Sequence, residues 1–332
     1  MIRRRAFISL LGGAAATVVS LPLVARAQGE RVRRVGVHMN SPADSSEGKA
    51  RFAAFLQALQ QLGWSEGRNL RLDVRWGSAA DPARNRKNAA ELLALAPDVI
   101  LATTTPSASA LQEATRTVPI VFAMAVDPVG SGVVDGLARP GGNITGFTQF
   151  EYTLSGKWVD LLKQIAPGTM RAAVFRDPAN PSGIGQFAVI QAVAPQVGIE
   201  VTPINVRDAA ETEARITTFA RSGNGGLITT GGQAVSHREL IFHLAAKHRL
   251  PVIYPYRFWV DDGGLISYGP DLPGLFRQAA GYVDRILRGE KPMDLPVQAP
   301  VKYELVINLK AATSIGLELP ASVLAGADEV IE

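Results

Sequence analysis

Apolar and polar positions alternate along the first half of the chain in blocks that predict strands and helices in turn. Short apolar runs such as RVGVHM at 34–39 are typical of buried strands, and Phe52, Phe55 and Leu59 recur at helical spacing. The predicted strands cover 34–39, 70–76, 98–102 and 119–124, and the predicted helices cover 47–62, 82–95 and 106–115. Regular alternation of this kind predicts a parallel sheet with helices on both faces.

The same alternation begins again after a segment rich in Gly and Pro, RPGGNITG at 139–146. Strands are predicted at 171–175, 199–206, 226–229, 251–254, 264–269 and 300–308, and helices around 158–165, 185–197, 211–221, 236–245 and 272–287. The chain is therefore predicted to be an α/β protein with two lobes built on the same plan.

The first 27 residues have the parts of an export signal. Three arginines at 3–5 precede an apolar stretch over 7–24, and an A-x-A site at 25–27 offers a cleavage point before Gln28. A membrane anchor is disfavoured, because the stretch contains two Gly and one Pro and is short for a span of about 20 residues. The sequence RRAFI at 4–8 is similar to twin-arginine export signals, and a Sec signal with an Arg-rich start is the alternative. We predict a cleaved signal peptide and a periplasmic protein.

Removal of this signal changes what the charge implies. The full chain has 34 Lys and Arg against 30 Asp and Glu, a net charge of +4, but residues 1–27 contain four Arg and no acid. The mature chain is then formally neutral, which gives no reason to expect nucleic acid as a partner. The absence of Cys excludes disulfides, Cys-ligated zinc, thiol catalysis and a lipid anchor on an N-terminal Cys. We expect a soluble monomer.

Motifs of catalysis and cofactor binding are missing from the sequence. It contains no G-x-S-x-G, no H-E-x-x-H, no Walker loop and no G-x-G-x-x-G after a predicted strand. The four His show no metal-ligand spacing, and the adjacent Asp261 and Asp262 precede two Gly and indicate a turn. We expect no enzyme activity, no metal and no cofactor. A secreted α/β enzyme would need a nucleophile or metal site that the sequence does not offer.

Polar and aromatic residues gather where the predicted strands end. In an open parallel sheet, small ligands bind beyond the carboxyl ends of the strands, so we expect these residues to line a cleft between the lobes. The candidate ligand-binding residues are Asn40, Ser41, Thr104, Thr105, Ser107, Asp127, Asp177, Asn180, Gly231, Tyr256 and Arg257. Each has the alternative role of a turn former or helix cap.

Three of these groups suggest how an amino acid would be held. Thr104 and Thr105 end a buried strand just before Pro106, where a helix should begin, so free backbone N–H groups and the positive helix end would attract an anion. Tyr256 would stack on a planar ligand, and Asp127 or Asp177 would pair with an amine. The alternative is that Thr105 only caps its helix and Tyr256 packs in the hinge.

Several longer blocks resemble one known family. They are 127–130 (DPVG), 137–146 (LARPGGNITG), 263–269 (GGLISYG), 282–292 (YVDRILRGEKP) and 303–310 (YELVINLK). They are similar to the ABC-transporter substrate-binding proteins of the TrpX type, and the resemblance covers nearly the whole mature chain. Described members of that family include tryptophan and tyrosine carriers, and many members have no assigned ligand.

The resemblance implies a type I periplasmic-binding-protein fold, in which two Rossmann-like lobes with parallel sheets are joined by three hinge strands. Lobe 1 would hold 31–147 and 266–295, and lobe 2 would hold 148–265 and 296–332. The expected function is that of a periplasmic component of an ABC importer that captures a small solute, an amino acid or an aromatic carboxylate, by hinge closure. Its partner would be an ABC permease in the inner membrane. The alternative is a sensory binding protein of the same fold that feeds a receptor.

Overall fold

The structure is a computed structural model that describes residues 31–78, 81–177, 181–205, 208–231 and 237–332. Residues from Val32 to Glu332 form one compact unit. The predicted signal peptide, 1–27, lies outside the described residues. None of the helices in the described part of the chain has the length and apolar character needed to cross a membrane.

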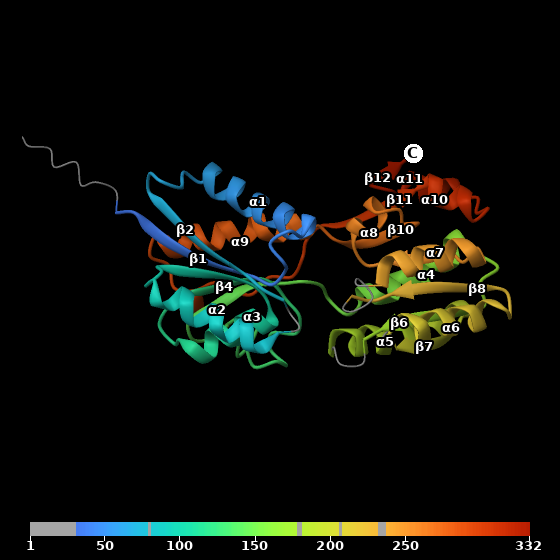
Figure 1. Cartoon of the computed structure of the whole chain (residues 1–332), viewed down its shortest axis with the longest axis horizontal. Helices are drawn as coiled ribbons and strands as arrows, with labels where there is room; N and C mark the ends of the chain where they lie inside the picture. Colours follow the sequence, from blue (N-terminus) through green and yellow to red (C-terminus); the bar gives the residue numbers. More distant parts are fainter. Residues whose placement is uncertain (1–30, 79–80, 178–180, 206–207, 232–236) are drawn as a thin grey trace, which may run out of the picture. The chain divides into compact units, whose positions relative to one another are not determined.

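The first sheet has five parallel strands, and the pattern of apolar and polar positions predicts four of them. In spatial order they are β2 (Leu70–Trp76), β1 (Arg33–Met39), β3 (Val99–Thr104), β4 (Ile120–Ala125) and β5 (Ile144–Thr148). The helices that cover it are α1 (Ser46–Gln61), α2 (Pro82–Ala94), α3 (Thr105–Ala114) and α9 (Leu272–Leu287). Figure 1 shows α1 beside α9 on one face and α2 beside α3 on the other. Helices on both faces explain why every residue of β4 and β5 is buried.

The second sheet has seven strands, in the order β12-β11-β10-β9-β8-β6-β7. Their bounds are β6 (Arg171–Arg176), β7 (Glu200–Asn205), β8 (Gly225–Thr229), β9 (Val252–Tyr254), β10 (Ile266–Pro270), β11 (Tyr303–Asn308) and β12 (Glu329–Ile331). The accompanying helices are α4 (Leu154–Ile165), α5 (Pro181–Val193), α6 (Ala209–Ala220), α7 (Arg238–His248), α8 (Arg257–Asp261), α10 (Leu309–Ser314) and α11 (Ala321–Ala325). Unlike the purely parallel sheet that we expected, this one contains an antiparallel pair, β10 with β11.

The chain passes between the two sheets three times. The crossings lie between β5 and α4, between β10 and α9, and between a short 3-10 helix at Pro292–Asp294 and β11. The stretch 266–270, which we expected in lobe 1, is β10, and its pairing with β9 and β11 places it in the second sheet. Because α9 packs against β3, β4 and β5, the return to the first lobe begins only after Pro270.

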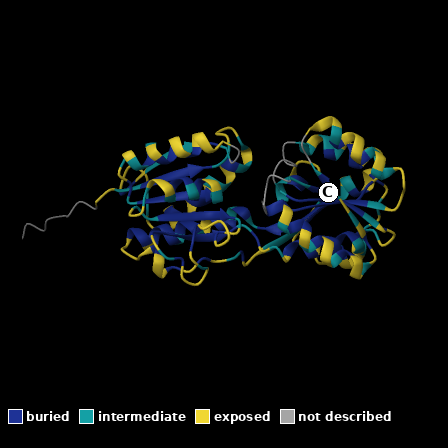
Figure 2. Ribbon diagram, turned by 90° about the horizontal axis from the view of Figure 1, so that it is seen from below, coloured by how far each residue is buried: buried dark blue, intermediate teal, exposed yellow. Residues whose placement is uncertain are grey.

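The hydrophobic core follows the two sheets. Figure 2 shows the strands buried in both lobes and the exposed residues on the outer faces of the helices. In α9, for example, Leu275, Ala279 and Val283 recur at intervals of one helical turn, Phe276 lies beside Leu275, and all four are 1% exposed or less. Burial of this stripe is what attaches α9 to the first sheet, even though the chain reaches α9 only after most of the second lobe.

Candidate functional site

The carboxyl ends of β1 and β3 bring two of the predicted residues, Asn40 and Thr104, together with Thr103. The backbone N–H of Asn40 donates to Thr103 Oγ1 at 2.8 Å, and Asn40 Nδ2 donates to Thr104 Oγ1. Because β1 and β3 are parallel neighbours, residues that lie more than 60 positions apart in the chain meet at this edge. Asn40, Thr103 and Thr104 therefore form one polar group at this edge.

The hydroxyl groups at the start of α3 have structural roles. The Ser107 hydroxyl accepts from the backbone N–H of Thr104 at 3.0 Å and donates to the Thr104 carbonyl at 2.8 Å. The Thr105 hydroxyl accepts from Val126 N at 2.9 Å and donates to Val126 O at 3.0 Å. Thr105 thus ties α3 to the end of β4, which is neither the helix cap nor the ligand contact that we considered.

Two polar atoms at this edge have no hydrogen-bond partner within the described part of the chain. They are Asn40 Oδ1 and Ser41 Oγ, and both atoms are buried. Ser41 lies against the first turn of α1, where a Cβ atom added to Gly48 would be only 2.4 Å from Ser41 Oγ. Unsatisfied buried polar atoms cost free energy, so these two atoms of adjacent residues at the end of β1 are candidates for contact with a polar ligand group.

Asp127 is a turn residue. It is exposed, it has a left-handed backbone with φ of +44°, and its Oδ1 accepts from Gly130 N at 2.9 Å. This side-chain-to-backbone hydrogen bond, three residues along the chain, stabilises the turn and explains Asp at this position without any ligand. Asp177, in contrast, is only partly exposed and follows β6, and it has an interaction within the chain. Asn180 lies outside the described residues.

Tyr256 is buried rather than open for stacking. Only 6% of it is exposed, and its ring stacks on that of Phe258 at 5.7 Å between centroids with 19° between the planes. Its hydroxyl accepts from Gln149 Nε2 at 2.8 Å, and a Cβ atom added to Gly231 would lie 3.5 Å from that hydroxyl. Gln149 follows β5 at the first crossing, so Tyr256 packs at the hinge, which was the alternative to ligand stacking. Burial raises the pKa of Tyr256 above its usual range.

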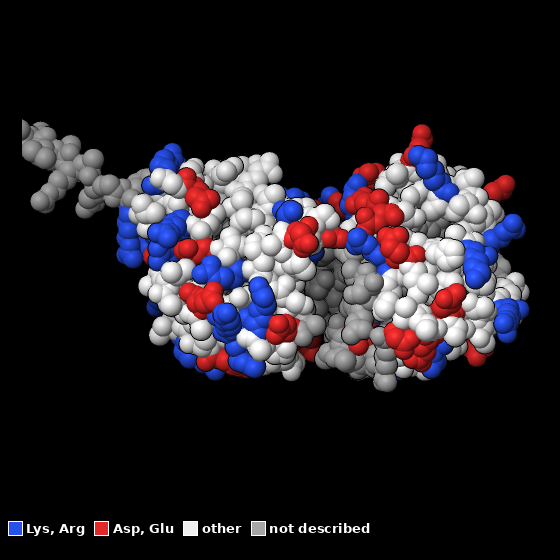
Figure 3. Space-filling view, viewed as in Figure 1, with Lys and Arg blue, Asp and Glu red and all other residues white. Residues whose placement is uncertain are grey.

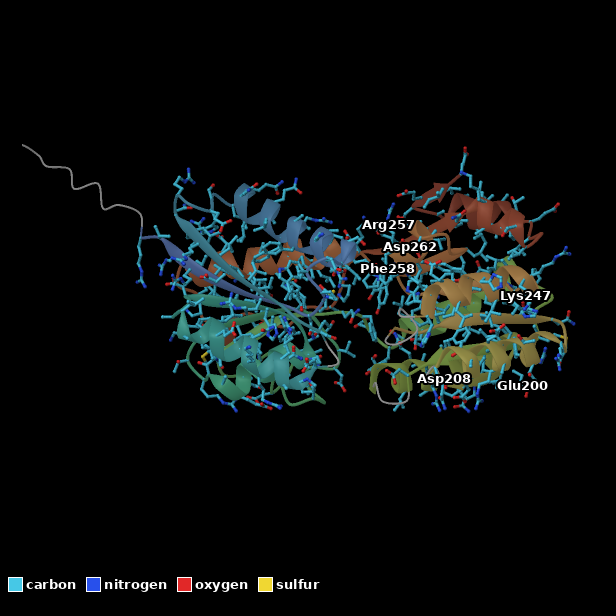
Figure 4. The ribbon with its side chains drawn as sticks, in the orientation of Figure 1. Glu200, Asp208, Lys247, Arg257, Phe258 and Asp262 are labelled. Atoms are coloured by element: carbon cyan, nitrogen blue, oxygen red, sulfur yellow. The ribbon has the colours of Figure 1, made fainter. Side chains whose placement is uncertain are left out.

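Arg257 faces the carboxylates of its own lobe. Its guanidinium is 2.6 Å from Glu329 Oε2 on β12 and 3.4 Å from Asp261 Oδ1. Figure 4 shows Arg257, Phe258 and Asp262 together at one end of this lobe, with Glu200 and Lys247 at its other end. The sequence predicted Arg257 only as one of the polar residues at the strand ends, and its charge is paired with Glu329 and Asp261.

Sequence reasoning missed an ionic group that joins α1 to the second lobe. Arg238 Nη1 is 2.9 Å from Glu47 Oε1 and 3.1 Å from Asp262 Oδ2. Although burial opposes it, hydrogen bonds from the backbone of Glu47 and from Arg238 and Ser45 lower the pKa of Glu47 to about 2. Burial raises the pKa of Asp262, and Arg238 offsets part of this effect. Glu47 and Arg238 lie 191 positions apart, so no sequence spacing could have paired them.

Arg51 was missed as well. It lies on α1, where its Nε donates to the backbone carbonyl of Glu47 at 2.8 Å and its Nη1 is 3.9 Å from Met124 Sδ near the end of β4. It is close enough to Tyr256 for its charge to oppose the effect of burial on the pKa of that phenol. In the sequence it looks like an ordinary solvent-facing position of an amphipathic helix.

A separate cavity of about 340 Å³ lies at the opposite edge of the first sheet. Arg33, Asp98, Pro119 and Asn143, which precede or begin four of its strands, contribute to its lining, and Lys291 lies beside them. It therefore does not belong to the group around Asn40 and Thr104.

Within the described ranges, no three His, Asp or Glu residues are grouped so that they could hold a metal ion. Lys and Arg are scattered among Asp and Glu on the visible face (Figure 3).

Two α/β lobes joined by three crossings give the chain the type I periplasmic-binding-protein fold. The family model described as "ABC transporter substrate binding protein" matches residues 42–331. The chain belongs to this family, which consists of solute-binding proteins of ABC transporters and not of enzymes.

Known proteins with similar sequence or structure agree with this assignment. A tyrosine-binding protein of Clostridioides difficile is 26% identical over 254 residues, which are 76% of this chain and 73% of that protein. A conserved domain protein of Vibrio cholerae has a structure similar to 90% of this chain and all of its own, with a TM-score of 0.80 and 28% identity. The ABC domain from Streptococcus pneumonia in complex with L-Trp covers 90% and 99%, with a TM-score of 0.79 and 23% identity, and therefore shows the shared fold.

Proposed function

We propose that this chain is the solute-binding component of an ABC importer and that it takes up a small organic carboxylate, an amino acid or an aromatic acid, between its lobes. Membership of the family supports the role in transport. The tyrosine-binding relative and the L-Trp complex of the Streptococcus protein support a ligand of this size and type. The partner would be a membrane permease, and the ligand-loaded protein would dock on it.

The observation that carries the ligand class is the polar group at the amino end of α3. The first turn of a helix leaves backbone N–H groups without partners inside the helix and carries partial positive charge, both of which favour a carboxylate. Asn40 Oδ1 and Ser41 Oγ lie at the neighbouring strand end without partners in the described part of the chain. Ser41 can donate to a carboxylate, and the Asn40 carbonyl can accept from a hydroxyl or amine of the same ligand.

Closure of the lobes would follow from the three crossings. A ligand that contacts both lobes stabilises the arrangement in which they approach, and the change in backbone angles is confined to a few residues at the ends of elements. The Gln149–Tyr256 hydrogen bond lies at one of these crossings and links it to the second lobe. The hinge is therefore proposed to include residues near Gln149, Pro270 and Gln298.

Export would depend on residues 1–27. N-terminal sequencing of the periplasmic protein should begin at Gln28, and a different first residue would refute the proposed cleavage site. Replacement of both Arg4 and Arg5 by Lys should leave the precursor in the cytoplasm if the export route is the twin-arginine pathway. Unchanged export of that variant would assign the signal to the Sec route.

A thermal-shift screen tests the proposed function directly. Ligand-free protein should be stabilised by at least one amino acid or aromatic acid, by about 2.7 kcal/mol when the ligand is present at about 100 times its dissociation constant. Thr104→Ala should weaken binding of that ligand by about 1 kcal/mol, measured by calorimetry, because the partner of Asn40 is lost. Thr117→Ala, an exposed change beyond the other end of α3, is the matched control. Unchanged affinity in Thr104→Ala would refute the site.

A further inference from the structure

Arg51 has more hydrogen-bonding capacity than its surroundings use. A guanidinium has five N–H donors, and the contacts of Arg51 are one backbone carbonyl, Glu47 O, and one sulfur atom, Met124 Sδ. Sulfur is a weak acceptor. In the described part of the chain no carboxylate lies at ion-pair distance from Arg51, although the neighbouring Glu47 lies one turn away on the same helix.

The position of Arg51 makes this unusual. Its side chain runs from α1 towards Met124, next to the last residue of β4, and towards Tyr256 of the second lobe, so it lies at the end of the sheet where the candidate site is found. Burial lowers the pKa of Arg51, and the nearby Glu47 and Tyr256 offset only part of this effect. Arg51 is half-buried, and a guanidinium that is partly shielded from water without an ion-pair partner is stabilised by an anion bound beside it.

Unlike Arg51, the carboxylates around the site have interaction partners within the chain. Glu47 and Asp262 share Arg238, and Asp127 accepts from Gly130 N in its turn. Asp177 also has an interaction of its own within the chain. Each of these carboxylates therefore has at least one partner within the chain, whereas Arg51 has no carboxylate partner among the described residues. A ligand ammonium group close to Arg51 would be repelled by its charge.

We infer that Arg51 binds the anionic group of the ligand and that the ligand carries a net negative charge, so that a carboxylic acid without an amino group binds more tightly than the α-amino acid of the same skeleton. This inference rests on the proposed function and narrows its ligand class. Arg51 would then determine the preference for organic acids over zwitterionic amino acids. The amino end of α3 and Ser41 would bind the other oxygen of the same carboxylate.

Matched pairs of compounds test the preference. Ligand-free protein is titrated by calorimetry with 3-phenylpropanoate against phenylalanine and with indole-3-propanoate against tryptophan, and the short aliphatic acids propanoate and butanoate are compared with alanine and 2-aminobutanoate. In each pair that binds, the acid is expected to bind at least about tenfold more tightly than the amino acid. Tighter binding of the amino acid in every such pair overturns the inference but leaves the proposed function intact. Failure of all acids and amino acids in the broad screen overturns the proposed function itself.

Variants of Arg51 test the residue. Arg51→Gln should lower the affinity for the tightest-binding acid by at least about tenfold and reduce the difference between the acid and its amino acid. Lys49→Gln removes one positive charge from an exposed position of the same helix and should leave affinity within about twofold. If Arg51→Gln does not fold by circular dichroism, Arg51→Lys replaces it, and its loss of the planar fork should still weaken binding by about threefold or more. A folded Arg51→Gln or Arg51→Lys with wild-type affinity and preference overturns the assignment.

Discussion

His38 should make the stability of the protein depend on pH in a window where few other groups titrate. It lies on β1, between β2 and β3 in the first sheet, is fully buried, and its Nε2 is 3.4 Å from Asn88 Nδ2 on α2. Burial lowers its pKa from 6.5 to about 4, and the Asn85 side chain offsets a small part of this shift. The folded protein therefore keeps His38 neutral at a pH where the unfolded chain would protonate it.

The size of the effect follows from linkage between protonation and folding. Because the pKa is lower in the folded state, stability is complete above pH 6.5 and is lost as the pH falls towards about 4. Between about pH 7.5 and about pH 5 the loss from this one group amounts to about 2 kcal/mol. The lowered pKa of Glu47, about 2, acts below this window and does not obscure the effect.

Urea denaturation of the ligand-free protein at these two pH values measures the loss of unfolding free energy. His38→Gln should remove about 2 kcal/mol of the pH dependence, whatever its own effect on stability at about pH 7.5. His243→Gln, at an exposed position on α7, is the matched control and should keep the wild-type pH dependence. If the unfolding free energies of wild type and His38→Gln fall equally between the two pH values, then burial of a neutral imidazole is not what limits stability in weak acid.

Two further predictions concern the close approach of Gly146 to the backbone of a neighbouring strand and the ion pair between the lobes. Gly146→Ala should destabilise the protein by about 3 kcal/mol or more in thermal unfolding, since φ is +151° and the new Cβ would lie 2.0 Å from Phe122 O. Gly281→Ala, inside α9 with no atom within 4 Å, should instead add up to about 1 kcal/mol, and equal effects of the two changes would contradict the packing described. A double-mutant cycle of Glu47→Gln and Arg238→Gln should give a coupling of less than about 1 kcal/mol that fades at high salt, because both side chains are partly solvated. A coupling that is large and independent of salt would show that the pair is more deeply buried than the structure indicates.

The strands that sequence predicts well are those with a clear apolar run or a clear alternation. The run at 34–39 corresponds to β1, Arg33–Met39, and 98–102 to β3, Val99–Thr104, since strands buried on both faces are rich in apolar residues. The alternating stretch 70–76 coincides with β2, Leu70–Trp76. β5, Ile144–Thr148, was not predicted, because it begins within a Gly-rich segment that indicates a turn. Its burial depends on β4 and on the crossing segment at Gln298, which pairs with Phe147. Local sequence does not contain that information.

The candidate site could be predicted in its residue types but not in its contacts. Strand ends were a sound guide to Asn40 and Thr104, since parallel strands place their carboxyl ends at one edge. The partner of Thr105 lies 21 positions away, and a hydroxyl in the sequence does not show whether it is engaged. Arg51 could not be recognised, because a charge on a helix is ordinarily solvated and only the fold shows that this one is enclosed.

The placement of α9 has a consequence for how the chain folds as it is made. The first lobe consists of two segments, and the second of them begins more than 120 residues after β5 ends. Until α9 has been synthesised, the apolar faces of α1 and β3 to β5 that it covers have nothing to pack against. The first lobe therefore cannot reach its native state by itself during vectorial synthesis, and its contacts carry a large loop-closure entropy. A chain truncated after β5 would expose that surface and aggregate, and a separate peptide spanning α9 would be expected to rescue it.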